Sequence, residues 1–320
     1  MRRLARMAAL AALAAAFLPL LSSCNPDEEK PKFLSKEEIE EIHERQKNNI
    51  DLDKYVEFRP GDCPVVFTVP HGGTLIENSL TLRSTSNCPD PDFATDLDYN
   101  TRELADDIDG EFFRQTGHHP YMVIAIIKRN HVDFNRKKAY AVPSGDEKLA
   151  KVYDRYHTLI SNVLDTITRT YGHGLLLDVH GQSHSEQIDI GYLLPVSTLN
   201  LNDNTLNGGT YAANSSINHL YQMNKNRYSY AQILRGDKSL GARLYANGLE
   251  CVPRPGNDTP GSTPYFNGGY TTLAYGSRNG GVIDAIQLEF RYSYRDLATE
   301  RKKAATATVK SINEFTSALW

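Results

Sequence analysis

The sequence predicts an α/β protein in which a mixed sheet lies between two layers of helices. Short apolar runs, suited to buried strands, alternate along the chain with longer amphipathic segments suited to helices. Polar clusters follow the apolar runs directly, and ligands of open α/β sheets bind beyond the carboxyl ends of the strands. The chain has 320 residues, of which 40% are hydrophobic and 23% charged, so it can bury a sizeable core.

Residues 1–24 have the organisation of an export signal. A basic start precedes an apolar run from Met7 to Leu21, which is too short for a membrane-spanning helix. The run leads to "LSSC", which resembles the lipobox of bacterial lipoproteins. This resemblance implies a lipid on Cys24 and a protein anchored in the bacterial cell envelope, at the outer membrane or on the cell surface. An ordinary secretory signal with an incidental cysteine is the alternative.

After a polar tether and an amphipathic helix in residues 25–50, we expect a single α/β domain in residues 51–320. Four apolar runs in this domain predict buried strands: "CPVVFTVP", "YMVIAIIK", "GLLLDV" and "DAIQLEFRY". Three amphipathic segments predict helices: "DLDYNTRELADDIDGEFFRQTG", "DEKLAKVYDRYHTLISNVLDTITRTYG" and "RDLATERKKAATATVKSINEFTSAL". In the first helix, Leu104, Ile108 and Phe112 recur at four-residue spacing and form one apolar face.

Residues 195–282, which precede the last predicted strand, differ in composition from the rest of the domain. They are rich in Asn, Gly, Pro and Thr, and they predict a loop-rich insertion with one helix at "GARLYAN". Such an insertion can form the wall of a substrate pocket.

Three cysteines lie beyond the export signal: Cys63, Cys88 and Cys251. An exported chain can form one disulfide from them and keep one free thiol. Pairing of Cys63 with Cys88 closes the shortest loop, but the sequence leaves the pairing open.

A polar cluster stands at the end of each predicted strand. These clusters comprise His71, the segment from Arg129 to Arg136, the segment from His180 to His184, and Glu289 with its neighbours. A single histidine at a strand end is more often a hydrogen-bonding group than a metal ligand. Glu289 lies among apolar strand residues, where desolvation raises a carboxyl pKa and so suits the group to general-base chemistry.

Taken in order, the motifs "VPHGG", "RNHVDFNR", "LLLDVHGQSH" and "QLEFR" resemble the N-formylglutamate amidohydrolase family. The wider relatives of that family are the zinc carboxypeptidases and the aspartoacylase-like deacylases. The resemblance extends from about Pro64 to Arg295 as spaced motifs, and it includes "RGDKSLGARLYANG" and "YFNGGYTTLAYGS" in the insertion. It implies a fold like that of the zinc exopeptidases and the phosphorylase/hydrolase group, and one bound zinc ion.

The resemblance implies that His71 and His180 are two of the zinc ligands. Catalytic zinc sites usually take three protein ligands, commonly two histidines and a carboxylate, and leave one position for water. The wider relatives carry the carboxylate in a His-x-x-Glu motif, but Thr74 occupies that position here.

Three acidic residues are candidates for the third ligand: Glu77, Asp96 and Asp98. Asp98 is preferred because "DYNTRELA" stands where the family has an aspartate ahead of its helix. The alternative is that Asp98 caps this helix by accepting hydrogen bonds from its free backbone N–H groups.

The resemblance also implies how the substrate is held. Asn135 and Arg136 match the pair that grips a free carboxylate, for which the planar guanidinium is suited. Arg129 lies near the position of an arginine that polarises the scissile carbonyl, and Glu289 matches the general base. Asp178 is expected to orient a ligand histidine.

Other polar residues in the motifs receive lesser roles. His184 is expected to line the pocket or the surface, while His131 and Asp133 are expected to be structural. Ser183 does not form a serine-hydrolase site, because "GQSHS" lacks the Gly-x-Ser-x-Gly pattern.

These residues predict a zinc-dependent amidohydrolase or carboxypeptidase-like hydrolase. Its expected substrate is an N-acyl amino acid, similar to N-formylglutamate, or a short peptide with a free carboxylate. The alternative is a non-catalytic surface lipoprotein that binds carboxylated ligands on the same fold. The absent His-x-x-Glu motif favours this alternative, whereas Glu289 favours an enzyme. The formal net charge of −4 and the lack of a long basic run exclude nucleic acid as a partner.

Overall fold

The computed structural model of the chain describes residues 50–320. The predicted export signal, the lipidation site at Cys24 and the tether with its helix up to residue 49 lie outside the described residues. None of the helices in the described part combines the length and the apolar character needed to cross a membrane.

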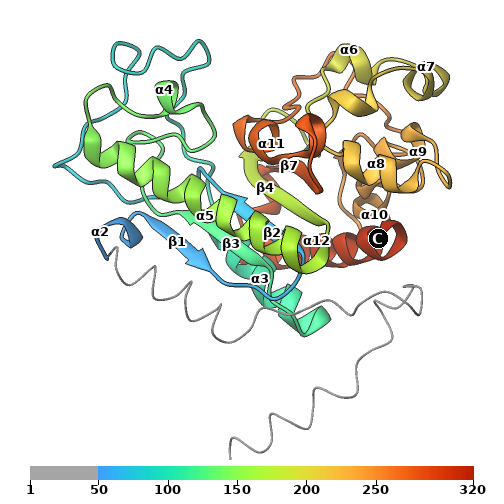
Figure 1. Cartoon of the computed structure of the whole chain (residues 1–320), viewed down its shortest axis with the longest axis horizontal. Coiled ribbons are helices and arrows are strands. Elements are labelled where there is room, and N and C mark those ends of the chain that lie inside the picture. Colours follow the sequence, from blue (N-terminus) through green and yellow to red (C-terminus); the bar gives the residue numbers. More distant parts are fainter. Residues whose placement is uncertain (1–49) are drawn as a thin grey trace, which may run out of the picture.

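Seven strands form one sheet in the order β1-β3-β2-β4-β7-β5-β6 (Figure 1). The four central strands, β3, β2, β4 and β7, are parallel to one another, while β1 and β5 run antiparallel to β3 and β7. β6 is parallel to β5 at the far edge. The bounds are β1 Val56–Arg59, β2 Val65–Val69, β3 Tyr121–Ala125, β4 Gly174–Gln182, β5 Ile188–Gly191, β6 Cys251–Val252 and β7 Ile283–Arg291.

Helices cover both faces of this sheet (Figure 1). The long helix α5, Glu147–Tyr171, packs on one face, and α3, Thr101–Thr116, packs with α12, Ala298–Leu319, on the other. Successive residues of a strand point to opposite faces, so Leu176 of β4 joins the core under α5 while Leu177 joins the core under α3 and α12. The predicted α/β class, with a mixed sheet between helical layers, is confirmed.

The four predicted strands are the four central ones, and the three predicted long helices are α3, α5 and α12. The remaining strands were not predicted. β1 and β5 have four residues each and β6 has two, so none of them shows a periodic pattern.

The insertion in residues 195–282 contains more helix than its composition predicted. Six short α-helices stand there where one was expected, and in Figure 1 they gather beside the sheet. Each is only four to seven residues long, too short for a hydrophobic period, although Ser229 and Gln232 form a recognisable capping box. The bounds are α6 Val196–Leu199, α7 Asp203–Gly208, α8 Asn218–Asn224, α9 Tyr230–Leu234, α10 Leu240–Ala246 and α11 Tyr270–Tyr275. The short helices α2 Ile50–Asp53 and α4 Lys138–Ala141 lie outside the insertion.

No disulfide links the cysteines within residues 50–320, although the sequence allows one. Cys63, Cys88 and Cys251 are all free thiols. Cys63 precedes β2 in the centre of the sheet, whereas Cys251 belongs to β6 at its edge. The thiols of these two residues instead contact the backbone oxygens of His119 and Gly241, each at 3.3 Å.

Candidate metal centre

The register of the sheet places polar side chains in one row across neighbouring strands. His180 of β4 is paired with Glu289 of β7, and Glu289 is paired with Asp189 of β5. Two residues earlier, Thr68 of β2 is paired with Asp178 of β4. Paired residues of adjacent strands project to the same face, so all five side chains lie on the α5 side of the sheet.

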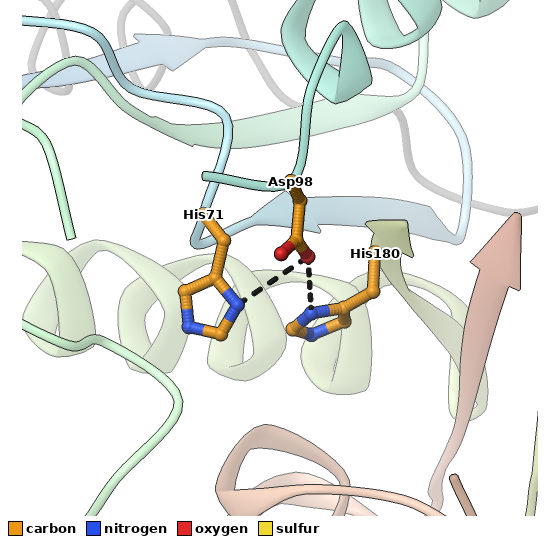
Figure 2. Close-up of side chains that lie close together, drawn as sticks. All are labelled: His71, Asp98 and His180. Carbon is orange, nitrogen blue, oxygen red and sulfur yellow. Dashed lines mark hydrogen bonds and ion pairs between the residues drawn. The ribbon is translucent and has the colours of Figure 1, made fainter. Parts of the chain in front are cut away.

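Three buried side chains at this row form a cluster that could hold a metal ion: His71, Asp98 and His180. One donor atom from each lies within 4.8 Å of the others. Figure 2 shows the Asp98 carboxylate between the two rings, with its Oδ2 atom 3.4 Å from His71 Nδ1 and 3.1 Å from His180 Nδ1. Two imidazole nitrogens and one carboxylate oxygen are the donor set of many catalytic zinc sites.

The hydrogen bonds of His71 fit a bound cation. Its Nε2 atom lies 2.8 Å from Asp133 Oδ1, and because a carboxylate only accepts, Nε2 carries the proton of the neutral ring. The Nδ1 atom is buried and has no hydrogen-bond partner among residues 50–320. A buried acceptor without a partner is destabilising, and a metal ion between the three ligands would satisfy it.

Each histidine of the cluster has a buried carboxylate behind it. Asp178 Oδ2 lies 2.9 Å from His180 Nε2, and Thr68 Oγ1 donates to the other oxygen of Asp178 at 2.6 Å. Asp133 lies in the same way behind His71, a contact that the sequence did not predict. Such carboxylates fix the ring orientation and leave the opposite nitrogen for a metal.

Asp133 is itself held as an anion. Although burial alone would raise its pKa, the neighbouring His71 and Arg129 hold the pKa well below its usual range. Arg129 Nε donates to Asp133 Oδ2 at 2.8 Å. The order of residues in "RNHVDFN" contains this pair at four-residue spacing, a signal that sequence reasoning could have used.

Asp98 does not cap helix α3. The N-cap residue is Asn100, and the Asp98 carboxylate turns the other way and accepts a hydrogen bond from the Gly181 backbone at 3.1 Å. Burial would raise the pKa of Asp98, but His71 and His180 lower it below its usual range. The other two candidates lie elsewhere: Glu77 pairs with Lys54, and Asp96 is exposed.

Glu289 lies beside the cluster and is almost fully buried. Its Oε1 atom is 3.9 Å from His180 Nδ1, and Gln287 Nε2 donates to the same oxygen. Burial raises the pKa of Glu289 to about 8, although His180 opposes the rise. A cation held by the three ligands would lower this pKa and favour the charged carboxylate.

Arg129 and Asn135 border the same space. Arg129 is buried, and the charge of Asp133, with smaller contributions from Asp98 and Glu289, raises its pKa against the effect of burial. No hydrogen bond within residues 50–320 involves its terminal Nη atoms. The Asn135 carboxamide accepts from the Thr271 backbone at 2.9 Å and lies 3.2 Å from His180 Nε2.

Arg136 already has partners in this structure. Its Nε atom donates to Asp90 at 2.8 Å, and its Nη atoms donate to the backbone oxygens of Asn135 and Asp92. A substrate carboxylate bound by Arg136 would have to replace the carboxylate of Asp90.

The remaining histidines of the motifs are not in the cluster. His184 Nε2 lies 2.9 Å from Asp189 Oδ2, and the His184 side chain is 20% exposed, as expected for a pocket or surface residue. His131 Nδ1 contacts the Thr81 backbone oxygen, and His131 Nε2 accepts from the Glu77 backbone. His131 therefore links loop segments.

No protein-family model matches the sequence, and no curated protein matches it. Among solved structures, N-formylglutamate amidohydrolase from Ralstonia eutropha JMP134 is similar at 12% identity and a TM-score of 0.47, over 82% of this chain and 98% of that one. A gene product from Agrobacterium tumefaciens is similar at 13% identity and a TM-score of 0.46, over 84% and 98%. A metallo-carboxypeptidase from Pseudomonas aeruginosa is similar at 12% identity and a TM-score of 0.37, over 90% and 70%.

Proposed function

We propose that the protein is a zinc-dependent hydrolase that cleaves an amide bond of an N-acyl amino acid or a short peptide with a free carboxylate. The observation that carries this proposal is the buried Nδ1 atom of His71, which forms no hydrogen bond within residues 50–320 and lies 3.4 Å from Asp98 Oδ2, a second acceptor, within a buried donor set. The adjacent Glu289 adds a group suited to proton transfer.

His71, Asp98 and His180 would hold the metal. When bound, zinc supplies Lewis-acid polarisation of a carbonyl oxygen and lowers the pKa of water towards neutrality. The carboxylates of Asp133 and Asp178 keep both rings oriented for this purpose.

Glu289 is the proposed general base. It accepts a proton from the attacking water and then delivers that proton to the leaving amine, so one side chain serves both halves of the reaction. Its burial excludes bulk water and raises its pKa, as is common for groups that transfer protons in active sites.

Arg129 and Asn135 are the proposed contacts to the substrate. The Nη atoms of Arg129 can donate to the amide carbonyl as negative charge develops on its oxygen. Asn135, together with Arg136 once Asp90 has been displaced, would bind the free carboxylate.

The proposed place of action is the bacterial cell envelope. The "LSSC" motif supports a lipid anchor on Cys24, and an anchored enzyme would encounter N-acyl amino acids and peptide fragments there. Such substrates carry the free carboxylate that the proposed contacts require.

The test combines metal analysis of the purified protein with a screen of N-acyl amino acids and short peptides. Each substrate is compared with the same compound carrying a C-terminal amide in place of the carboxylate. We expect one zinc per chain and turnover of the carboxylates only. Zinc-loaded protein that binds these compounds without turnover would instead indicate the non-catalytic alternative, and protein that binds no zinc would refute the metal site.

A further inference from the structure

Asp98 reaches the candidate metal centre from a loop, whereas His180 belongs to a strand. The loop connects β2 to α3, and Asp98 stands three residues before that helix begins. Near the centre, its backbone N–H donates to the His71 oxygen at 3.2 Å and its carboxylate accepts from the Gly181 backbone. A loop ligand needs further support to keep its carboxylate in position.

Asn100, two residues after Asp98, has an unusual backbone conformation. Its φ of 59° lies in the left-handed region, which is uncommon for a residue other than glycine and which asparagine tolerates best. The Asn100 carboxamide makes no cap hydrogen bond to α3. It donates instead to the backbone oxygens of Arg295 at 2.9 Å and Asp296 at 3.2 Å, in the segment that joins β7 to α12.

Arg295 in turn donates hydrogen bonds to the loop that carries Asp98. Its guanidinium is buried and forms no ion pair in the described part of the chain, but it donates to three backbone oxygens, those of Tyr99, Phe290 and Gln182. It lies directly over Gly181, where an added Cβ would stand only 2.3 Å from the guanidinium carbon. The absence of a side chain at Gly181 therefore makes room for Arg295.

We propose that Asn100 and Arg295 form a reciprocal clasp that positions the Asp98 carboxylate for the metal ion. One arm runs from the Asn100 carboxamide to the Arg295 backbone, and the other from the Arg295 guanidinium to the Tyr99 backbone. The two arms hold Tyr99 and Asn100, the two residues that immediately follow Asp98. Both residues act through Asp98, so they are positioning residues, and the inference rests on the metal site of the proposed function.

The test measures zinc affinity by competition with a chelator in the full-length protein. Asn100→Gly removes the carboxamide but still allows the left-handed backbone conformation. Asn100→Ala removes the carboxamide and also disfavours that conformation. Residues that orient a metal ligand typically contribute about 10- to 100-fold in affinity, and we expect losses in this range, larger for Asn100→Ala. The absorption spectrum of the cobalt-substituted protein should change with the ligand set in both variants.

Asn224→Ala is the matched control, because the Asn224 carboxamide also donates to two backbone oxygens, those of Leu220 and Leu319. We expect this variant to lose thermal stability but to keep wild-type zinc affinity. Arg295→Lys, which retains the charge but cannot reach three carbonyls at once, should weaken zinc binding as Asn100→Gly does.

A double-mutant cycle with Asp98→Ala separates the possible failures. If the clasp acts through Asp98, Asn100→Gly has no further effect on affinity in the Asp98→Ala background. If Asp98→Ala weakens zinc binding while Asn100→Gly leaves it at the wild-type value, the clasp is refuted and the metal site stands. If Asp98→Ala itself has no effect, the third ligand of the proposed function is wrong and the clasp falls with it.

Discussion

Replacement of Glu289 by glutamine should abolish most activity and, in the metal-free protein, increase stability. The side chain keeps its size and its bond from Gln287, but it can no longer accept a proton. Loss of a general base costs on the order of 100- to 10,000-fold in rate, and the larger end applies where the same group also protonates the leaving amine. Zinc content should be retained, because Glu289 is not one of the three ligands.

The gain in stability follows from the pKa of Glu289. Burial raises this pKa from 4.5 to about 8, so the folded protein binds the proton more tightly than the unfolded chain does. Stability is therefore lost as pH rises from about 4.5 to about 8, because the unfolded chain ionises first. The loss is at most about 1 kcal/mol at pH 5 and about 3 kcal/mol at pH 7. Glutamine has no charge to desolvate and does not incur this loss.

The assay is urea unfolding of chelator-treated wild-type and Glu289→Gln protein at pH 5 and at pH 7. The difference in free energy of unfolding between the two proteins should grow by about 2 kcal/mol in favour of the variant between these pH values. Turnover is measured on zinc-loaded samples of the same preparations. A difference that does not change with pH would refute the reasoning about burial, and near wild-type turnover with zinc intact would refute the role of base.

Three further predictions test separate parts of the protein. Asp98→Ala should lose bound zinc while Glu77→Ala keeps it, as measured by metal analysis; the opposite result would mean that the third ligand is misassigned. Burial lowers the pKa of His157 to about 4, so the unfolded chain binds a proton first and stability should fall between about pH 6.5 and pH 4. His157→Gln should remove up to about 3 kcal/mol of this acid destabilisation in urea unfolding, and an unchanged slope would contradict it. Cys24→Ala should move the protein from the membrane fraction to the soluble fraction, and unchanged membrane association would reject the lipid anchor.

The sequence was sufficient for the parts of the fold in which a single element carries its own signal. β2 and β3 are almost wholly apolar and β4 begins with an apolar run, because both faces of the sheet are covered. α5 is long enough for its hydrophobic period to show. β5 has no such signal: its sequence "IDIG" contains Asp189, which is buried against His184 and the Phe266 backbone. Only tertiary contacts make this segment a strand.

The sequence was likewise sufficient for the two histidines of the candidate site but not for its carboxylate. His71 and His180 stand at the ends of strands, and the order of strands in a parallel sheet brings such positions together. Only the family resemblance favoured Asp98 over Asp96 and Glu77, because the loop conformation that brings the Asp98 carboxylate to the two histidines leaves no pattern in the local sequence. That conformation depends on the bond from Asn100 to the Arg295 backbone, across 195 positions of sequence.

Arg136 shows a second limit of motif reasoning. The motif "FNR" predicts an arginine that faces the substrate, but it contains no information about Asp90, which lies 46 positions away and binds the Arg136 guanidinium. Arg129, by contrast, donates from Nε to Asp133, which belongs to the same motif. Its Nη atoms are therefore available for the substrate contact that we propose.

The environment of Glu289 favours the proposed enzyme over the alternative, a protein that only binds carboxylated ligands. A site that only binds anions gains nothing from a buried acid 3.9 Å from His180. The charged form of Glu289 would repel the bound anion. The neutral form could be replaced by an uncharged side chain such as glutamine. We expect the same acid to lower the stability of the metal-free fold by up to about 3 kcal/mol at pH 7, a large share of the stability of an ordinary domain. Proton transfer beside a metal, unlike capture of an anion, requires both the carboxylate and its burial. If Glu289→Gln binds a carboxylated substrate as tightly as the wild type but does not turn it over, the destabilising carboxylate serves the chemical step.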